Sequence, residues 1–425
     1  MTDSIGVGRA VQAKLYRDGV YGRRPPVPVS AAALEAAASG RMTPQARAYV
    51  VGSAGLEDTA RANRAAFDTW RIVPRMLRDV SVRDTSVELF GRRYPSPFLT
   101  APVGVLGMVH PKGDVAVAKA AAELGVPMIF SNQASYPMER CAAAMGDAAR
   151  WFQLYWSSSD QLVASFVRRA EAIGCGAVVV TLDTHMLGWR PRDLDAAYLP
   201  FARGLGIAQY TSDPVFGALV KQRAAQARTA DQRPTYSAVK ALASMARAYP
   251  GGFWENLRSP LPRAAVDTFL DVFSRSNLTW DNLSYLREHT SLPVLLKGVL
   301  HPEDAAKALS AGVDGIVVSN HGGRQVDGSI AALDALPDVV ETVAGRVPVL
   351  FDSGIRGAAD AFKAIALGAT AVCVGRPYVY GLALAGQRGV EAVLGHLMAE
   401  FDLTMGLTGC AAVSDITRDA LRRVA

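Results

Sequence analysis

A histidine and an arginine that follow a short apolar run are the residues of this chain best suited to chemistry. Residues 315–325 read Gly-Ile-Val-Val-Ser-Asn-His-Gly-Gly-Arg-Gln. The β-branched run predicts a strand buried on both faces, and the two glycines let the backbone turn sharply or approach a ligand closely. His321 can change its protonation near neutral pH, and the Arg324 guanidinium can bind a carboxylate through two hydrogen bonds. The pattern predicts acid/base chemistry on an anionic substrate, against the alternative of a capped strand whose His and Arg only satisfy a loop.

Two later segments predict a phosphate site. Asp-Ser-Gly-Ile-Arg at 352–356 and Gly-Arg-Pro at 375–377 belong to two further apolar runs. Backbone N–H groups beside Gly354 and Gly375, together with the guanidiniums of Arg356 and Arg376, can bind one phosphate. The alternative is a pair of tight turns with surface arginines. The first interpretation implies a phosphorylated cofactor.

Lys297 indicates what else that cofactor carries. It lies near the end of an apolar run and is expected to point into the same site, where an ammonium is costly unless an anion compensates its charge. A reduced flavin supplies that anion at N1 and O2 of its ring. Thr181 and Gln153, near the ends of two other runs, can satisfy the polar edge of the ring with hydrogen bonds.

The elements that must position these residues alternate between two types. Eight short apolar runs, most of them separated by Ala-rich and helix-prone stretches, predict a (β/α)8 TIM barrel in the α/β class. In that fold the loops after the strands carry the chemistry, and nearly every run ends in polar residues. A doubly wound sheet lacks support because no Gly-x-Gly-x-x-Gly follows any run. The runs are 97–103, 127–132, 151–155, 177–184, 293–299, 315–322, 348–355 and 371–378, and the helix-prone stretches include 115–124, 162–173, 303–310 and 358–367.

The alternation predicts a single barrel domain over residues 1–425, and two segments lie outside the alternation. Residues 1–95 precede the first run and look mostly helical, so we expect an N-terminal helical cap. Residues 188–292 form a long insertion after the fourth run, and a lid and an oligomer-contact arm are equally open interpretations. Its first part is rich in aromatic residues, which favours a folded structure. The middle of the insertion, residues 217–265, contains an Ala/Gln/Arg-rich stretch at 221–247. This stretch predicts a solvated helix or partial disorder.

Composition narrows the class of protein and of partner. The chain has 425 residues, of which 50% are hydrophobic and 20% charged, so a large core is available. Four scattered cysteines without metal-ligand spacing, and no apolar run long enough to span a bilayer, predict a cytoplasmic protein without a metal or a membrane partner. The net charge of +6 comes from dispersed basic residues, which favours small anions over nucleic acid.

With these motifs together, the sequence resembles the FMN-dependent family that oxidises 2-hydroxy acids, over about residues 45–216 and 265–420. The resemblance rests on Ser-Asn-His-Gly-Gly-Arg-Gln at 319–325, Leu-Lys-Gly at 296–298, and the segments at 352–356 and 375–377. Within the family, Asp-Thr-His-Met-Leu-Gly-Trp-Arg-Pro-Arg-Asp at 183–193 is most similar to the lactate 2-monooxygenase branch. The resemblance implies FMN as cofactor and a homotetramer or larger assembly.

The resemblance also implies a role for each matching residue. His321 is the catalytic base and Asp183 the carboxylate that orients it, although Asp-Thr after a strand can also begin a helix. Arg190 and Arg324 bind the substrate carboxylate, with hydroxyl contacts from Tyr49 and Tyr155. Residues implied along the flavin ring are Ala101, Pro102, Val103, Gly104, Ser131, Gln153, Thr181, Lys297 and Ser319, and those implied at the ribityl phosphate are Asp352, Gly354, Arg356, Gly375 and Arg376.

Two positions depart from the pattern of the family. Several relatives have alanine where this chain has Gly104, next to flavin N5, and the extra room is a hypothesis for altered oxygen reactivity. Gln133 replaces an apolar or aromatic residue above the substrate pocket, and a polar wall there argues against lactate itself. His185 and His110 occupy no matched position and are interpreted as structural or exposed.

The expected reaction is the FMN-dependent oxidation of a small, lactate-like L-2-hydroxy acid by O2. If the lid retains the keto acid, hydrogen peroxide decarboxylates it, and the enzyme is a monooxygenase of the lactate 2-monooxygenase type. If the keto acid is released first, the enzyme is an oxidase. A dehydrogenase with another electron acceptor, an FMN-using isomerase and a non-redox phosphate binder are the remaining alternatives.

Overall fold

The computed structural model describes residues 6–226 and 235–424, and eight parallel strands closed into a barrel form its centre. Each predicted apolar run overlaps one of these strands, so the predicted (β/α)8 TIM barrel is confirmed. Around the barrel the strands follow the order β10-β11-β4-β5-β6-β7-β8-β9. In chain order they are β4 (Phe98–Thr100), β5 (Met128–Phe130), β6 (Arg150–Leu154), β7 (Val178–Thr181), β8 (Val294–Val299), β9 (Gly315–Val318), β10 (Val349–Phe351) and β11 (Ala371–Val374).

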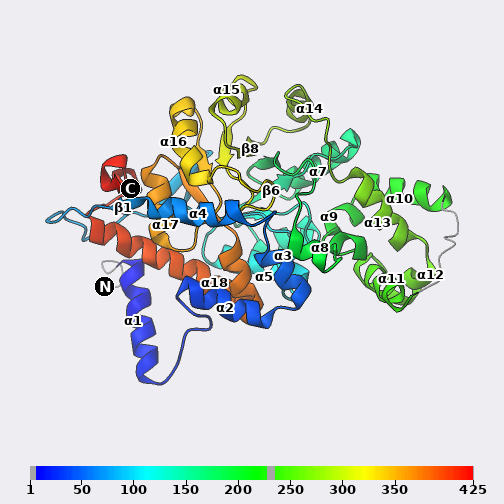
Figure 1. Cartoon of the computed structure of the whole chain (residues 1–425), viewed down its shortest axis with the longest axis horizontal. Helices are drawn as coiled ribbons and strands as arrows, with labels where there is room; N and C mark the ends of the chain where they lie inside the picture. Colours follow the sequence, from blue (N-terminus) through cyan, green and yellow to red (C-terminus); the bar gives the residue numbers. More distant parts are fainter. Residues whose placement is uncertain (1–5, 227–234, 425) are drawn as a thin grey trace.

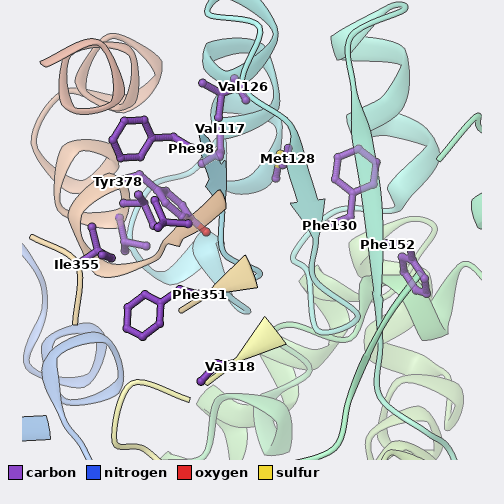
Figure 2. Packing of buried hydrophobic residues seen from close by; sticks show 14 of the residues in the cluster. Phe98, Val117, Val126, Met128, Phe130, Phe152, Val318, Phe351, Ile355 and Tyr378 are labelled. Atoms are coloured by element: carbon purple, nitrogen blue, oxygen red, sulfur yellow. The ribbon is translucent and has the colours of Figure 1, made fainter. Parts of the chain in front are cut away.

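Helices cover the outside of this barrel (Figure 1). The four predicted helix-prone stretches coincide with α5 (Gly113–Glu123), α7 (Asp160–Ala172), α15 (Pro302–Ser310) and α17 (Ala358–Ala366). The main core fills the space between strands and helices, where Phe98, Phe130, Phe152 and Phe351 are buried from the outward face of their strands (Figure 2). The remaining covering elements are η1 (Leu106–Met108), α6 (Met138–Met145), α14 (Asn282–His289), α16 (Ala332–Val343) and α18 (Arg376–Thr408), which bends at Ala385 and Gly386.

A second, smaller core fills the inside of the barrel and explains how the site is built. Successive side chains of a strand alternate between the two faces, so every second residue points inward. One inward layer is Leu99, Ile129, Trp151, Val179, Leu295, Val317, Leu350 and Cys373, all of them buried. Two residues further along each strand, at the carboxyl ends, follow Ala101, Ser131, Gln153, Thr181, Lys297, Ser319, Asp352 and Gly375. The side-chain period therefore brings eight predicted site residues into one mostly polar layer at the barrel mouth.

The N-terminal segment consists of four helices and lies against the barrel. They are α1 (Val7–Val20), α2 (Ala31–Arg41), α3 (Pro44–Val51) and α4 (Asp58–Asp68). Thr43 caps α3 by accepting a hydrogen bond from the Ala46 N–H, and Pro44 suits the first helical position. A hairpin of β2 (Val87–Leu89) and β3 (Arg92–Tyr94) contributes to the inner core, while β1 (Trp70–Ile72) pairs with β12 (Leu421–Arg423) after η3 (Val413–Asp415) and η4 (Arg418–Ala420).

The insertion between β7 and β8 is folded in the part that the structure describes, and its helices gather at one side of the barrel (Figure 1). Phe201, Tyr210, Phe216 and Phe269 are buried against one another. Helices α10 and α11 cover much of the stretch in which a solvated helix or disorder was expected, and residues 227–234 of that stretch lie outside the described residues. The elements are α8 (Pro191–Asp195), η2 (Pro200–Arg203), α9 (Ala208–Thr211), α10 (Pro214–Gln226), α11 (Tyr236–Ala248), α12 (Phe253–Arg258) and α13 (Leu261–Val272).

Candidate active site

A cavity opens at the carboxyl ends of the barrel strands. Most of the predicted site residues line it, and they come from both the proposed substrate end and the proposed phosphate end. These residues are Tyr49, Ala101, Pro102, Val103, Gly104, Tyr155, Arg190, Lys297, His321, Arg324, Asp352, Gly354, Arg356, Gly375 and Arg376.

Predicted residues that do not line the cavity support it from within the polar layer. Gln153 is fully buried, and its Nε2 donates to Thr181 Oγ1 at 3.0 Å while its Oε1 accepts from Ser131 Oγ at 3.2 Å. These bonds join three neighbouring strands and fix the orientation of the amide. The arrangement gives the cavity a rigid polar floor.

Lys297 is held as a buried ammonium in the same floor. Its Nζ donates to Ser319 Oγ at 2.9 Å and lies 3.0 Å from Asp352 Oδ2. Burial lowers the pKa of Lys297, but the carboxylates of Asp352 and Asp183 more than offset this and raise it above its ordinary value. The ammonium is therefore permanent, and it offers positive charge to whatever lies on the floor.

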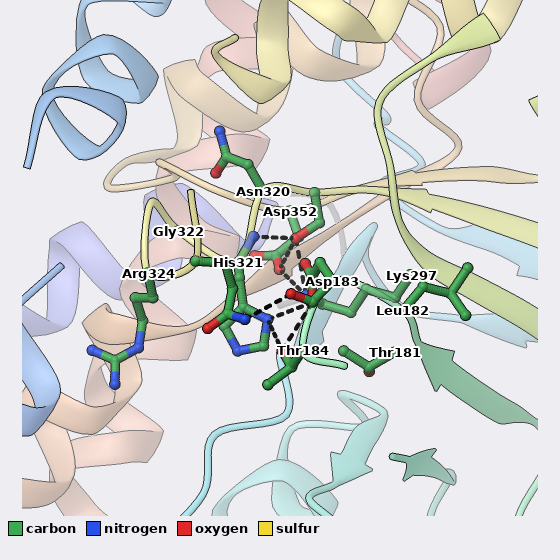
Figure 3. Close-up of polar contacts among 12 residues, drawn as sticks. Thr181, Leu182, Asp183, Thr184, Lys297, Asn320, His321, Gly322, Arg324 and Asp352 are labelled. Atoms are coloured by element: carbon green, nitrogen blue, oxygen red, sulfur yellow. Dashed lines mark hydrogen bonds and ion pairs between the residues drawn. The ribbon is translucent and has the colours of Figure 1, made fainter. Parts of the chain in front are cut away.

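His321 and Asp183 meet from opposite sides of β8 (Figure 3). His321 Nδ1 donates to Asp183 Oδ1 at 2.8 Å, which leaves Nε2 with its lone pair. The contact needs a glycine at 298, because a Cβ there would lie 2.9 Å from the Asp183 Cβ at a backbone φ of +105°. No helix begins at Asp183; the next one begins at Pro191. The N-cap interpretation of Asp183 is thus wrong, and the carboxylate is free to orient the imidazole.

The electrostatics of this pair favour a neutral histidine beside an ionised aspartate. Burial lowers the pKa of His321 below its ordinary value, despite the opposing effect of Asp183. Burial raises the pKa of Asp183, but His321, the charge of Lys297 and the hydrogen bonds from His321 and Thr184 outweigh burial and set it at about 2. The second oxygen of Asp183, Oδ2, is buried and has no hydrogen-bond partner among the described residues. A neutral imidazole beside an ionised carboxylate is the protonation state that a general base requires at working pH.

The backbone of His321 is itself unusual. It adopts φ +58°, and Gly322 and Gly323 follow at φ +65° and +76°. A left-handed residue other than glycine costs on the order of 1 kcal/mol or more and persists only where the surroundings fix it. Here the His321 N–H donates to Ser319 Oγ at 3.0 Å, and the Gly322 N–H donates to Ser353 Oγ at 3.0 Å. The strained turn aims the imidazole into the cavity.

Two arginines and two tyrosines complete the substrate end. Figure 3 shows Arg324 on the side of His321 away from Asp183. Arg324 Nη1 donates to the Gly52 carbonyl at 2.7 Å and also to the Tyr49 carbonyl, and its guanidinium lies 5.0 Å from the Tyr49 ring. Arg190 donates from Nη2 to Gln325 Oε1 at 2.7 Å, and burial together with Arg324 lowers its pKa to about 10. Burial raises the pKa values of Tyr49 and Tyr155, so both hydroxyls stay protonated.

The phosphate end lies where β10 and β11 finish, as TIM barrels often place it. Gly354 has φ +95°, and a Cβ there would lie 2.8 Å from the Asn63 carbonyl oxygen, so only glycine fits. Arg356 is partly exposed, 3.9 Å from Glu35. Arg376 departs from the expectation, because its Nε, Nη1 and Nη2 donate to the carbonyls of Val50, Gly322 and Gly52. A second N–H on Nη2 donates to Ser53 Oγ, so four of the five N–H groups of Arg376 have partners. The remaining N–H, on Nη1, is left for a phosphate.

The charge balance of the cavity tests whether FMN fits. Five cationic side chains line it, against the single carboxylate of Asp352. Burial and the neighbouring arginines lower the pKa of Arg376 to about 9, the sign of a buried cation short of a counter-ion. A phosphate dianion and a substrate carboxylate supply the missing negative charge. The polar floor, the glycine turns and this excess of positive charge all fit FMN at the barrel mouth.

Gln325 and Thr184 are among the site residues that sequence reasoning missed. Gln325 donates to the carbonyls of Asp183 and Met186 and accepts from Arg190, so it connects both functional loops. It was already part of the motif at 319–325, but a neutral amide gave no sign of that bridging role. Thr184 Oγ1 donates to Asp183 Oδ1 at 3.1 Å. His185 and His110 do not line the cavity, consistent with the structural interpretation given to them.

Comparison with known proteins agrees with this geometry. A family model described as FMN-dependent dehydrogenase matches residues 38–423. The chain is 40% identical to the FMN-dependent alpha-hydroxy acid dehydrogenase qulF of Penicillium citrinum over 97% of this chain and 95% of that protein. It is 41% identical to an L-lactate oxidase of Lysinibacillus sphaericus over 92% of each. Mandelate oxidase, solved with (S)-4-hydroxymandelic acid, superposes with a TM-score of 0.76 and 37% identity, over 93% of this chain and 98% of that chain. The chain therefore belongs to the FMN-dependent dehydrogenase family of 2-hydroxy acid oxidoreductases, and FMN is its cofactor.

Proposed function

We propose that the protein oxidises an L-2-hydroxy acid at its α-carbon, with His321 as the base and O2 as the electron acceptor. The observation that carries the proposal is the buried 2.8 Å contact between His321 Nδ1 and Asp183, beside the cationic cavity that Arg190 and Arg324 line. A protein that only binds a phosphate has no need of a neutral base opposite two arginines. The relatives named for L-lactate and for mandelate support a 2-hydroxy acid as the substrate.

Each residue of the substrate end has a defined task in this proposal. Arg324 and Arg190 bind the substrate carboxylate and so orient the α-carbon. His321 Nε2 takes the proton of the α-hydroxyl, and Asp183 stabilises the imidazolium that forms. Tyr49 and Tyr155 donate hydrogen bonds from hydroxyls that burial keeps protonated. When bound, FMN would supply the redox chemistry: it would accept the α-hydrogen as a hydride and would later pass two electrons to O2, which with two protons gives hydrogen peroxide.

The fate of the keto acid decides between monooxygenase and oxidase. We propose the monooxygenase outcome, in which hydrogen peroxide attacks the retained 2-keto acid and gives a carboxylic acid one carbon shorter, carbon dioxide and water. Leu187, directly before the insertion, and Arg190, within it, line the cavity, which supports retention behind a lid. Gly104 fits this proposal, because a Cβ there would crowd Gln133 at 3.1 Å and Tyr49 Oη at 3.4 Å, beside the expected position of the flavin. The expected homotetramer remains a prediction.

Flavin reduction without oxygen tests the proposed base and carboxylate site. Wild-type protein should bleach when L-lactate or a longer homologue is added anaerobically. His321→Ala and Arg190→Ala should remain yellow, because one lacks the base and the other lacks a carboxylate contact. Normal reduction of both variants would show that these roles are wrongly assigned.

Product analysis tests the fate of the keto acid. Aerobic turnover should release carbon dioxide and the shortened acid in equal amounts. Stoichiometric keto acid and free hydrogen peroxide would establish the oxidase alternative instead. Reduction by the acid with little oxygen consumption would indicate a dehydrogenase that uses another acceptor.

A further inference from the structure

The structure contains a second cavity that adjoins the active site. Tyr49, Leu187 and Arg190 line both cavities, so the two meet at these side chains. The second cavity lies between the loop after β7 and the insertion, and none of its lining residues has a role in the proposed oxidation chemistry beyond those three. Its other lining residues are Gly188, Asp193, Leu194, Ala197, Tyr198, Leu199, Ala202, Arg203 and Ala241.

The walls of this second cavity are mostly apolar and include small residues. Leu194 and Leu199 come from the loop and α8, while Ala202 of η2 and Ala241 of α11 leave space open. Leu187 and Leu194 are 43% and 47% exposed, although both line cavities near the protein interior. Apolar side chains left exposed around a hollow gain free energy when an apolar group fills it.

The helix that closes the second cavity is held in place. Ser244 Oγ on α11 donates to the Arg203 carbonyl at 2.9 Å. A Cβ added to Gly204 would lie 3.1 Å from Met245 Cα, so the two backbones pack closely. The cavity is therefore a formed space between packed elements. Asp193, Arg190 and Arg203 are the charged residues of its wall, and the other lining residues are uncharged.

The chemistry of the active site directs one substituent of the substrate toward this space. In the proposed function, which this inference extends, the arginines hold the carboxylate and His321 faces the hydroxyl. The hydrogen on the α-carbon must face the flavin ring. The remaining substituent is the substrate side chain, and Leu187 offers it an apolar wall that continues into the second cavity.

We propose that the second cavity binds the side chain of the substrate, and that the preferred substrates are L-2-hydroxy acids with an apolar side chain several carbons longer than that of lactate. The protein accepts such a chain past Leu187 and between α8, η2 and α11. Burying one methylene group improves binding about fourfold. Three further methylenes, from lactate to 2-hydroxyhexanoate, should raise the efficiency of flavin reduction roughly 60-fold.

A chain-length series with cavity-filling variants tests the inference. Anaerobic flavin reduction is followed with L-lactate, L-2-hydroxybutanoate, L-2-hydroxyhexanoate and L-2-hydroxyoctanoate, and the rate constant divided by the dissociation constant is compared. Ala241→Phe and Ala202→Phe should remove most of the gain for the longer acids and leave L-lactate within about twofold. Ala238→Phe is the matched control, because Ala238 is exposed on the same helix and does not line the cavity.

Binding of hexanoate, which lacks the hydroxyl, gives a readout without turnover and is measured by calorimetry. If hexanoate binds tightly, and Ala241→Phe weakens this binding while Ala238→Phe does not, the second cavity is supported. This conclusion holds even if none of the acids reduces the flavin. A failure of every acid to reduce the flavin would refute only the proposed oxidation. Highest efficiency with L-lactate, together with no effect of Ala241→Phe on longer acids, would overturn the inference and leave the proposed oxidation intact.

Discussion

Replacing Asp183 by asparagine should lower the maximal rate of flavin reduction and should also move the acid limb of its pH profile to lower pH. The carboxylate opposes the burial that lowers the pKa of His321, and Asp183 is itself ionised at every working pH because its pKa is about 2. Removing its charge lowers the pKa of His321 further. Since the base must be neutral, the rate rises with pH through this pKa. The acid limb of Asp183→Asn should therefore move to lower pH.

The same substitution should lower the plateau that the rate reaches above that limb. The His321 imidazolium that forms during the reaction loses a charge-assisted hydrogen bond of 2.8 Å. Such bonds contribute about 1.5–3 kcal/mol, which corresponds to a rate lower by a factor of about 10 to 150. The shift of the acid limb and the lower plateau both come from the loss of one interaction, but a pH profile shows them separately.

Stopped-flow measurement of anaerobic flavin reduction between about pH 4 and 9 provides the assay. Thr184→Val is the matched control, because it removes the 3.1 Å hydrogen bond to Asp183 Oδ1 and keeps the carboxylate. Its plateau should fall less than that of Asp183→Asn, and its acid limb should hardly move. An acid limb that moved to higher pH in Asp183→Asn, or a plateau equal to that of wild type, would refute the assignment of Asp183 and His321.

Three further changes test the rest of the site. Lys297→Met leaves Asp352 without its ammonium partner at 3.0 Å. The flavin content, measured by absorbance, should fall, and the free energy of unfolding, measured by urea denaturation, should drop by about 3–5 kcal/mol. Unchanged values would contradict the buried pair. Gly354→Ala forces a Cβ to within 2.8 Å of the Asn63 carbonyl at φ +95°, and should weaken FMN retention on dialysis, whereas Gly345→Ala, also at positive φ but in open space, should not. Gly104→Ala places a Cβ 3.1 Å from Gln133 and should change the oxygen rate of reduced protein more than its anaerobic reduction; an unchanged rate and product would remove Gly104 from the account.

The spacing of the apolar runs and the two-residue period of the strands predicted the barrel well, because both are properties of the local sequence. Eight apolar runs placed the strands, and the alternation of side chains within each strand then set which residues reach the mouth. Ser131, Gln153 and Thr181 follow from this rule without any knowledge of a cofactor, since each lies two positions beyond a residue of the inner core. The polar layer could therefore be predicted from the sequence.

Contacts between distant segments could not be predicted in this way. Arg376 follows β11 as expected, yet its guanidinium is bound to the carbonyls at the end of α3, which no local pattern places nearby. Gln325 bridges two loops through an amide that has no charge to attract notice. The second cavity depends on how α11 packs over η2, and the sequence of the insertion gives little indication of that packing.

The bound end of α3 has a functional consequence for the whole mouth of the barrel. Arg324 and Arg376 both donate to carbonyls between Tyr49 and Gly52, so the helix that presents the Tyr49 hydroxyl is held by one arginine from each end of the cavity. A phosphate can take the free N–H on Arg376 Nη1 while the other four N–H groups keep their partners, so one side chain would join the cofactor to this helix end. We therefore expect the N-terminal segment to take part in the active site, because the position of the Tyr49 hydroxyl, for which we propose a substrate contact, depends on arginines of the barrel.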